Sequence, residues 1–221
     1  MLQNSTLKFL KDLKKNNNRE WFAENKEVYE RAKADFESFL AQLIEKLSAI
    51  YPRLKDLTPK DCVFRIYRDV RFSKNKDPYK TNFAASIKPG GRKSADSGLY
   101  LHIEPDGEWG NFVGGGYWMP EAPLLKKIRQ EIEYNHEEFF KIIKDKNFKK
   151  IFGQLEEHKL TRLPKGIPAD HPAAEYLKYT SFLVTHNFEK EELKSNQAIK
   201  TITSSFKAMQ PLLAFLNRVH D

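Results

Sequence analysis

Apolar residues recur at helical spacing through the first fifty positions of the chain. They predict a helix over residues 5–15 and a longer amphipathic helix from about 19 to 50. Asn16–Asn18 breaks the first helix and offers an N-cap for the second, which Tyr51-Pro52 ends. The N-terminal part of the chain is therefore predicted to be a helical hairpin.

Between residues 63 and 113 the apolar period changes to two. Alternating β-branched and aromatic residues predict strands over 63–68, 83–87, 99–103 and about 109–113. Turn-forming Pro, Gly and Asp residues separate these segments. Because neighbouring strands are joined by short connections, an antiparallel β-meander is expected.

The remaining residues return mainly to helical spacing. Helices are expected over 120–134, 137–144, 147–152 and about 195–219, with short strands over 160–163 and 180–185 and a helix begun by Asp170-His171-Pro172. Pro211 should kink or restart the last helix. The prediction is an α+β fold: a meander of about four strands or more, packed with an N-terminal helical hairpin and C-terminal helices. One domain over 1–221 is the economical interpretation, with two subdomains split near 120 as the alternative.

Cysteine content and hydropathy indicate the cellular compartment in which the protein is expected. Cys62 is the one cysteine, so no intramolecular disulfide forms, and it is expected in the core at the start of a strand. No signal-like segment is recognisable, and no apolar run approaches the length needed to span a bilayer. A cytoplasmic protein without a membrane partner is expected.

The positive charge of the chain is concentrated in one region. The formal net charge is +8, and residues 65–93 account for +7 of it. Nine basic side chains in that window face two aspartates, whereas acidic and basic residues are interspersed elsewhere. Such localisation favours an anionic partner.

The segment from Arg65 to Lys80 is the main candidate for a binding site. If residues 64–72 stay extended, Arg68 shares a face with apolar neighbours, which is costly unless it is paired. Arg65 and Arg71 then flank Asp69 on the other face, an arrangement suited either to an internal ion-pair network or to forked recognition of phosphate or carboxylate. The candidate anion-binding residues are Arg65, Arg68, Asp69, Arg71, Lys76, Tyr79 and Lys80.

Two further groups are candidates for lining a pocket. Gly114, Gly115 and Gly116 precede Trp118, and glycines permit close backbone approach to a ligand, although a strand end with a bulge explains them equally well. His102 and Glu104 lie two residues apart on one strand face, where they form either a proton-transfer pair or two metal ligands. No third ligand at a suitable spacing accompanies them, so no metal is assigned. The residues identify no cofactor, reaction or oligomeric state.

Three functions compete at this stage. The leading hypothesis is a protein that binds a small molecule carrying phosphate or carboxylate through the arginine- and lysine-rich segment. The alternative is a nucleic-acid-binding module, because aromatic residues are interleaved with the basic ones. The third is a non-catalytic protein-interaction domain in which the arginines form internal salt bridges.

Several longer motifs resemble those of one family. They are Asn17-Asn18-Arg19-Glu20-Trp21-Phe22, Tyr67-Arg68-Asp69-Val70-Arg71-Phe72-Ser73, Lys76-Asp77-Pro78-Tyr79-Lys80-Thr81-Asn82 and Gly114-Gly115-Gly116-Tyr117-Trp118-Met119-Pro120. The chain resembles, over nearly its whole length, an uncharacterised and largely bacterial family of conserved hypothetical proteins, domain of unknown function 2461. The resemblance implies one α+β domain and supplies no reaction, substrate or cofactor. Its landmark residues 17–21 are interpreted as helix caps and core, with a wall of the arginine site as the alternative.

Overall fold

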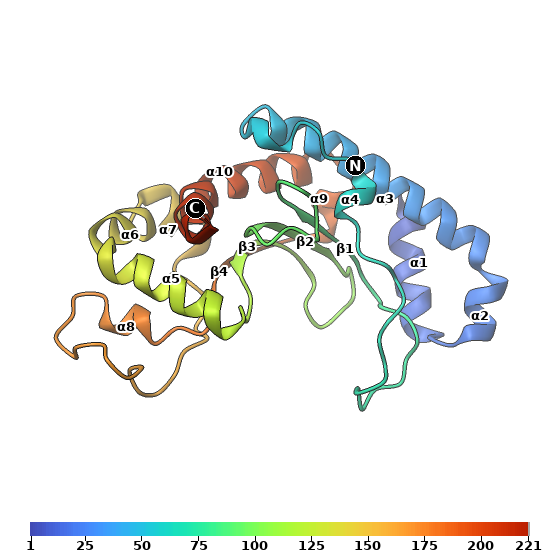
Figure 1. Ribbon diagram of the computed structural model, residues 1–221. Helices are drawn as coiled ribbons and strands as arrows, with labels where there is room; N and C mark the ends of the chain where they lie inside the picture. The colour runs from blue at the N-terminus through green and yellow to red at the C-terminus, as the bar shows by residue number, and fades with distance from the viewer. Residues whose placement is uncertain (221) are drawn as a thin grey trace. The chain divides into compact units, whose positions relative to one another are not determined.

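A computed structural model describes residues 1–220 and shows an α+β fold with one four-stranded antiparallel sheet (Figure 1). The strands are β1 (Phe83–Ile87), β2 (Gly98–Ile103), β3 (Asn111–Tyr117) and β4 (Phe182–Phe188). Before the sheet come α1 (Asn4–Lys15), α2 (Arg19–Glu24), α3 (Lys26–Ser48) and α4 (Pro59–Cys62). Between β3 and β4 lie α5 (Ala122–Tyr134), α6 (His136–Ile143), α7 (Lys146–Phe152) and α8 (Ala174–Leu177), and α9 (Lys190–Leu193) and α10 (Gln197–Asn217) follow β4. The strand order β1-β2-β3-β4 is a meander, so the predicted fold class is confirmed.

The chain forms two compact units, and β2 and β3 each contribute residues to both. The first unit comprises Met1–Ser94, Tyr100–Val113 and Asn187–Ser204, and the second comprises Ala95–Leu99, Gly114–His186 and Ser205–Asp221. A single domain over 1–221 remains a prediction. No helix within residues 1–220 has both the length and the apolar character required to cross a membrane.

The core of the first unit is an aromatic and aliphatic layer between β1 and the N-terminal helices. The Phe83 ring stacks on that of Phe36 from α3, with centroids 5.2 Å apart, and lies 6.4 Å from that of Phe9 in α1. All three rings are buried. Since side chains alternate along a strand, the neighbouring residues Asn82 and Ala84 are directed to the opposite face of β1. The candidate site lies on that opposite face.

Several predicted elements differ in their limits. The helix expected over 19–50 is interrupted at Asn25, whose side chain donates to the Trp21 carbonyl, so α2 and α3 are separate. Residues 63–68 make only the isolated bridges Val63–Ala85 and Tyr67–Tyr79, and Lys159 makes another to Tyr179, so the strands predicted over 63–68 and 160–163 do not form. The last helix does not restart at Pro211, which lies inside α10. Cys62 is buried as expected, but at the end of α4 and not at the start of a strand.

The second unit is held by buried polar contacts and by one strongly paired arginine. The Tyr117 hydroxyl donates to Asn217 at 2.9 Å, and the same Asn217 oxygen accepts from Ser97. Arg218 makes a forked contact with Glu138 and a further one, at 3.3 Å, with Glu131. Both terminal guanidinium nitrogens of this arginine therefore have a carboxylate acceptor within the unit.

Candidate functional site

The basic segment forms an irregular hairpin beside β1. In Figure 1 it is the long teal loop that extends away from α4. The Phe64 N–H donates to the Ala84 carbonyl, the Lys80 N–H to Ile66 and the Arg68 N–H to Pro78. Beyond Arg68 the backbone turns away, so residues 64–72 do not remain extended, and Phe72 is 94% exposed and not on a core face.

A bulge in this hairpin directs its side chains. The bridges Val63–Ala85 and Tyr67–Tyr79 enclose four residue steps on one arm and six on the other. The two extra residues fall in the stretch around Thr81 and bend it. Thr81 consequently donates to Glu104 at 2.6 Å, while Asn82 reaches His102.

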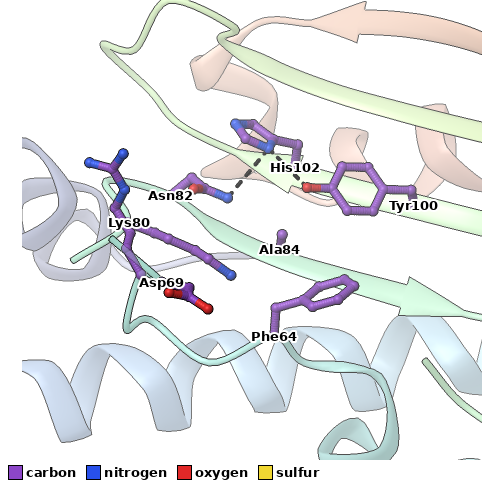
Figure 2. Close-up of a pocket in the computed structure, with 8 residues that line it drawn as sticks. Phe64, Asp69, Lys80, Asn82, Ala84, Tyr100 and His102 are labelled. Atoms are coloured by element: carbon purple, nitrogen blue, oxygen red, sulfur yellow. Dashed lines mark hydrogen bonds between the residues drawn. The ribbon is translucent and has the colours of Figure 1, made fainter. Parts of the chain in front are cut away.

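The hairpin, β1 and β2 line an open pocket of about 450 Å³, a size typical of small-molecule sites. It is lined by Phe64, Arg68, Asp69, Lys80, Asn82, Ala84, Tyr100 and His102. Figure 2 shows the Lys80 side chain extending into the space bounded by Asn82, Asp69 and Ala84, with His102 and Tyr100 on the β2 side. Cationic, polar and aromatic groups thus converge on one cavity within the first unit.

Lys80 is a half-buried cation in this pocket without a compensating carboxylate among the described residues. Its side chain is half-buried, and no carboxylate of residues 1–220 lies within ion-pair distance of Nζ. Burial, assisted by the nearby charge of Arg65, lowers the pKa of the Lys80 amine. Its nearest favourable partner is the Phe64 ring, whose centroid lies 5.5 Å from Nζ.

The other charged residues of the basic segment make contacts within the hairpin. Arg71 makes a bidentate contact with Asp69, at 2.9 and 2.6 Å, and this contact with Arg71 lowers the pKa of Asp69. The Arg68 side chain, 26% exposed, reaches Asp77 and Ser73 only at 3.3 Å or more. Lys76 donates to the Val70 carbonyl. The sequence suggested an ion-pair network of Arg65, Asp69 and Arg71. Among residues 1–220 the structure shows the Asp69–Arg71 pair, and Arg65 is exposed.

His102 and Glu104 are brought together at the base of the pocket, and each is 8% exposed. Nε2 of His102 lies 3.5 Å from Oε2 of Glu104, which is within ion-pair distance, but this buried nitrogen has no hydrogen-bond partner among residues 1–220. Nδ1 lies 3.3 Å from both the Asn82 amide nitrogen and the Tyr100 hydroxyl. The ring stacks on Phe112 with centroids 4.8 Å apart, which fixes its plane.

Glu104 is held in its ionised form by neighbouring donors. Burial alone raises the pKa of this carboxyl, but the nearby His102 ring and hydrogen bonds from Thr81 and the Trp109 N–H lower it on balance. Gly107 is required beside it, since a Cβ at that position would lie 1.8 Å from the Glu104 carboxyl carbon. The turn formed by Pro105-Asp106-Gly107 therefore packs closely against the Glu104 carboxylate.

The glycine run is part of β3 and does not contribute to the lining of the pocket. A Cβ at Gly114 would approach the Val184 carbonyl to 2.8 Å, and one at Gly115 would approach the Met209 sulfur to 2.5 Å. Gly116 has a φ of 123° and lies against Phe182. These glycines permit close packing within the second unit, and Trp118 beyond them is 60% exposed, with its ring edge to face with that of His158.

Sequence reasoning missed the polar residues that complete the pocket. Asn82 and Tyr100 line it, although neither carries charge or belongs to a recognisable catalytic motif. Asn17 positions the hairpin: its amide donates to the Tyr79 carbonyl at 2.9 Å and accepts from the Tyr79 N–H at 3.1 Å. Asn18 caps α2 by accepting from the Trp21 N–H, as expected. The available signal for Asn17 was its place in a family landmark.

The geometry defines an α+β protein with a cationic pocket on one face of its sheet, backed by a buried carboxylate–imidazole pair. The family model of the conserved hypothetical proteins designated DUF2461 matches residues 5–215, so the chain belongs to this family. Neither the curated proteins nor the solved structures contain a match.

Proposed function

We propose that the pocket binds a small ligand through a phosphate or carboxylate group. The observation that carries the proposal is Lys80, a half-buried cation without a carboxylate partner among residues 1–220, located in a cavity of about 450 Å³. Burying a charge without compensation is unfavourable, and an anion in the cavity would restore the lost interaction.

Arg68 supports the same proposal from the opposite arm of the hairpin. Its contacts with Asp77 and Ser73 are long, so the guanidinium retains capacity to donate to a ligand. Asp69 also lines the pocket, but the forked contact with Arg71 balances its charge. The net charge at the cavity therefore favours an anion.

Thermal unfolding in phosphate at constant ionic strength tests this binding. Phosphate at 100 times its Kd stabilises the folded state by about 2.7 kcal/mol, which corresponds to a rise in Tm of about 5–10 °C for a chain of this size. Lys80→Met is expected to remove that rise. Lys74→Met is the matched control, because it removes the same charge from an exposed position on the same hairpin outside the pocket.

Two outcomes would count against the proposal. Tm would remain unmoved by millimolar phosphate, carboxylates and nucleotides, or both substitutions would reduce the shift equally. The second outcome would indicate general charge screening and no specific site.

Exposed aromatic rings on the hairpin favour nucleic acid as a second candidate. Phe72 is 94% exposed and Tyr67 51%, and both lie among basic residues, as a surface for stacking single-stranded bases requires. Retention of a single-stranded oligonucleotide should then weaken with salt, by about 0.7 in the log–log slope for each phosphate contact. Absence of retention at low salt would eliminate this candidate.

A further inference from the structure

The imidazole of His102 is flanked by a carboxylate on one side and opens to the pocket on the other. Glu104 faces Nε2, and the cavity-lining groups Asn82 and Tyr100 face Nδ1 (Figure 2). We propose that the pocket is a hydrolytic site in which His102 acts as general base on a phosphodiester. This inference rests on the anion binding proposed above.

The hydrogen bonds specify which nitrogen is the base. In the observed orientation the Asn82 amide N–H donates toward Nδ1, so Nδ1 carries the lone pair of the neutral ring. Nε2 then carries the proton and lies 3.5 Å from the buried Glu104 carboxylate, although the two groups do not have hydrogen-bond geometry. A carboxylate at this distance stabilises the imidazolium that forms when Nδ1 accepts a proton.

Nδ1 remains accessible to a water molecule from the cavity. Two donors, Asn82 and Tyr100, share its single lone pair, and both distances are long at 3.3 Å. A water entering between them donates to Nδ1 and accepts from one of the two donors. The exchange replaces a weak contact with a well-formed hydrogen bond.

The chemistry of the lining favours a phosphodiester as substrate. The base and the cations Lys80 and Arg68 line the same cavity, so the anionic group that binds is also the group that reacts. A diester carries one negative charge and repels the attacking oxygen less than a monoester dianion does. The aromatic side chains of Phe64 and Tyr100 provide apolar walls for its organic groups.

The reaction balances with groups present in the pocket. Nδ1 of His102 takes one proton from water while the water oxygen forms a bond to phosphorus. The bond from phosphorus to one ester oxygen breaks, its electron pair stays on that oxygen, and the Lys80 ammonium supplies a proton to it. The imidazolium then loses its proton to solvent and the Lys80 amine regains one, so a diester and water give a monoester and an alcohol.

The pH dependence follows from the charged groups that face these two residues. His102 is faced by Glu104 and Tyr100, and across the cavity by Arg68, Asp69 and Lys80, while Lys80 is additionally faced by Arg65. The rate should fall at alkaline pH as the Lys80 amine loses its proton. Burial lowers the pKa of Lys80 and so makes the ammonium a better proton donor.

Two phosphodiesters with different leaving groups test the proposal. Bis(4-nitrophenyl) phosphate has a leaving group that needs no proton, whereas a thymidine dinucleoside monophosphate releases an alkoxide that does. The wild-type chain should hydrolyse both, and His102→Asn should lower both rates by about 100-fold or more. Lys80→Met should lower hydrolysis of the dinucleotide more than that of the nitrophenyl ester. Lys74→Met should leave both rates unchanged.

Glu104→Gln provides a second variant in case His102→Asn fails to fold. It keeps the imidazole but removes the carboxylate charge, so kcat should fall while KM and the phosphate-induced rise in Tm are retained, which a purely structural role would not cause. Rates equal in wild type and His102→Asn, or hydrolysis of neither probe, would overturn the proposal. If phosphate still raises Tm through Lys80, anion binding stands while hydrolysis falls; if it does not, both fall.

Discussion

The basic hairpin and the glycine run are both distinctive in the sequence, but they differ in how they are packed and paired in the structure. Gly114–Gly116 lies inside β3, where neighbouring backbone and side chains fill the space that a Cβ would occupy. The hairpin makes few regular backbone pairs and leaves Lys80 without a carboxylate partner among residues 1–220. A glycine cluster can therefore reflect packing, whereas a half-buried cation without a carboxylate partner in the described part of the chain, beside a pocket, is the observation on which the proposed anion site rests.

The largest expected effect is at Gly116. Its φ of 123° is unfavourable for any residue with a side chain, and a Cβ there would lie 2.0 Å from the Phe182 carbonyl oxygen. Gly116→Ala should therefore cost about 4 kcal/mol or more, because strain and a backbone clash add. Urea denaturation measures the loss.

Gly153→Ala is the matched control for this substitution. Gly153 also has a positive φ, of 70°, but nothing lies within 4 Å of the Cβ position. Only the conformational cost of its backbone angles, φ 70° and ψ −69°, should appear, about 1–3 kcal/mol. Equal losses at the two positions would show that close packing is not the reason for Gly116.

An intermediate effect is expected at Asn17, which anchors the hairpin. Asn17→Ala removes both side-chain hydrogen bonds to the Tyr79 backbone and leaves those groups without their partner. The expected loss is about 2 kcal/mol, with faster amide hydrogen exchange at Tyr79.

Asn18→Ala separates this anchoring role from simple helix capping. Asn18 caps α2, so its loss should cost about 1 kcal/mol. It should not alter exchange at Tyr79. If both variants changed that exchange equally, the anchoring assigned to Asn17 would be wrong.

The spacing of apolar residues predicted most of the fold, because helices and strands each repeat a characteristic apolar pattern along their length. The limits of β1 coincide with the predicted segment, and α1 and α7 differ by one residue. The long N-terminal helix was placed without its break, since Asn25 interrupts it through a local side-chain bond that no apolar spacing records. Gly114–Gly116 were considered as pocket lining or as a bulged strand end, because the neighbours that require their small size are distant in sequence.

The candidate site was predictable only in part. Charge identified Arg68, Asp69 and Lys80, and strand alternation paired His102 with Glu104. The convergence of these two groups depends on the bulge near Thr81, which turns Asn82 toward His102. The amino-acid composition of a hairpin does not reveal how its two arms are paired. The pocket could therefore be found only from the three-dimensional structure.

The smallest expected effect compares a buried carboxylate of the site with an exposed one. Because hydrogen bonding lowers the pKa of Glu104 in the folded state, its charge stabilises the fold above the unfolded pKa of about 4.3. Glu104→Gln should therefore cost about 1.5 kcal/mol at pH 7.

The difference between wild type and Glu104→Gln should then shrink as the pH falls below about 4.3 and disappear below the folded pKa, because the protonated carboxyl no longer contributes charge. Urea denaturation at several pH values measures it, with the exposed Glu108→Gln as a control that should show no such trend. A difference that persisted unchanged into acid would mean that Glu104 is already protonated at neutral pH. In that case it would be unable to stabilise an imidazolium at His102. The glycine strand would still be explained by packing, but the proposed hydrolytic role of the pocket would lose its support.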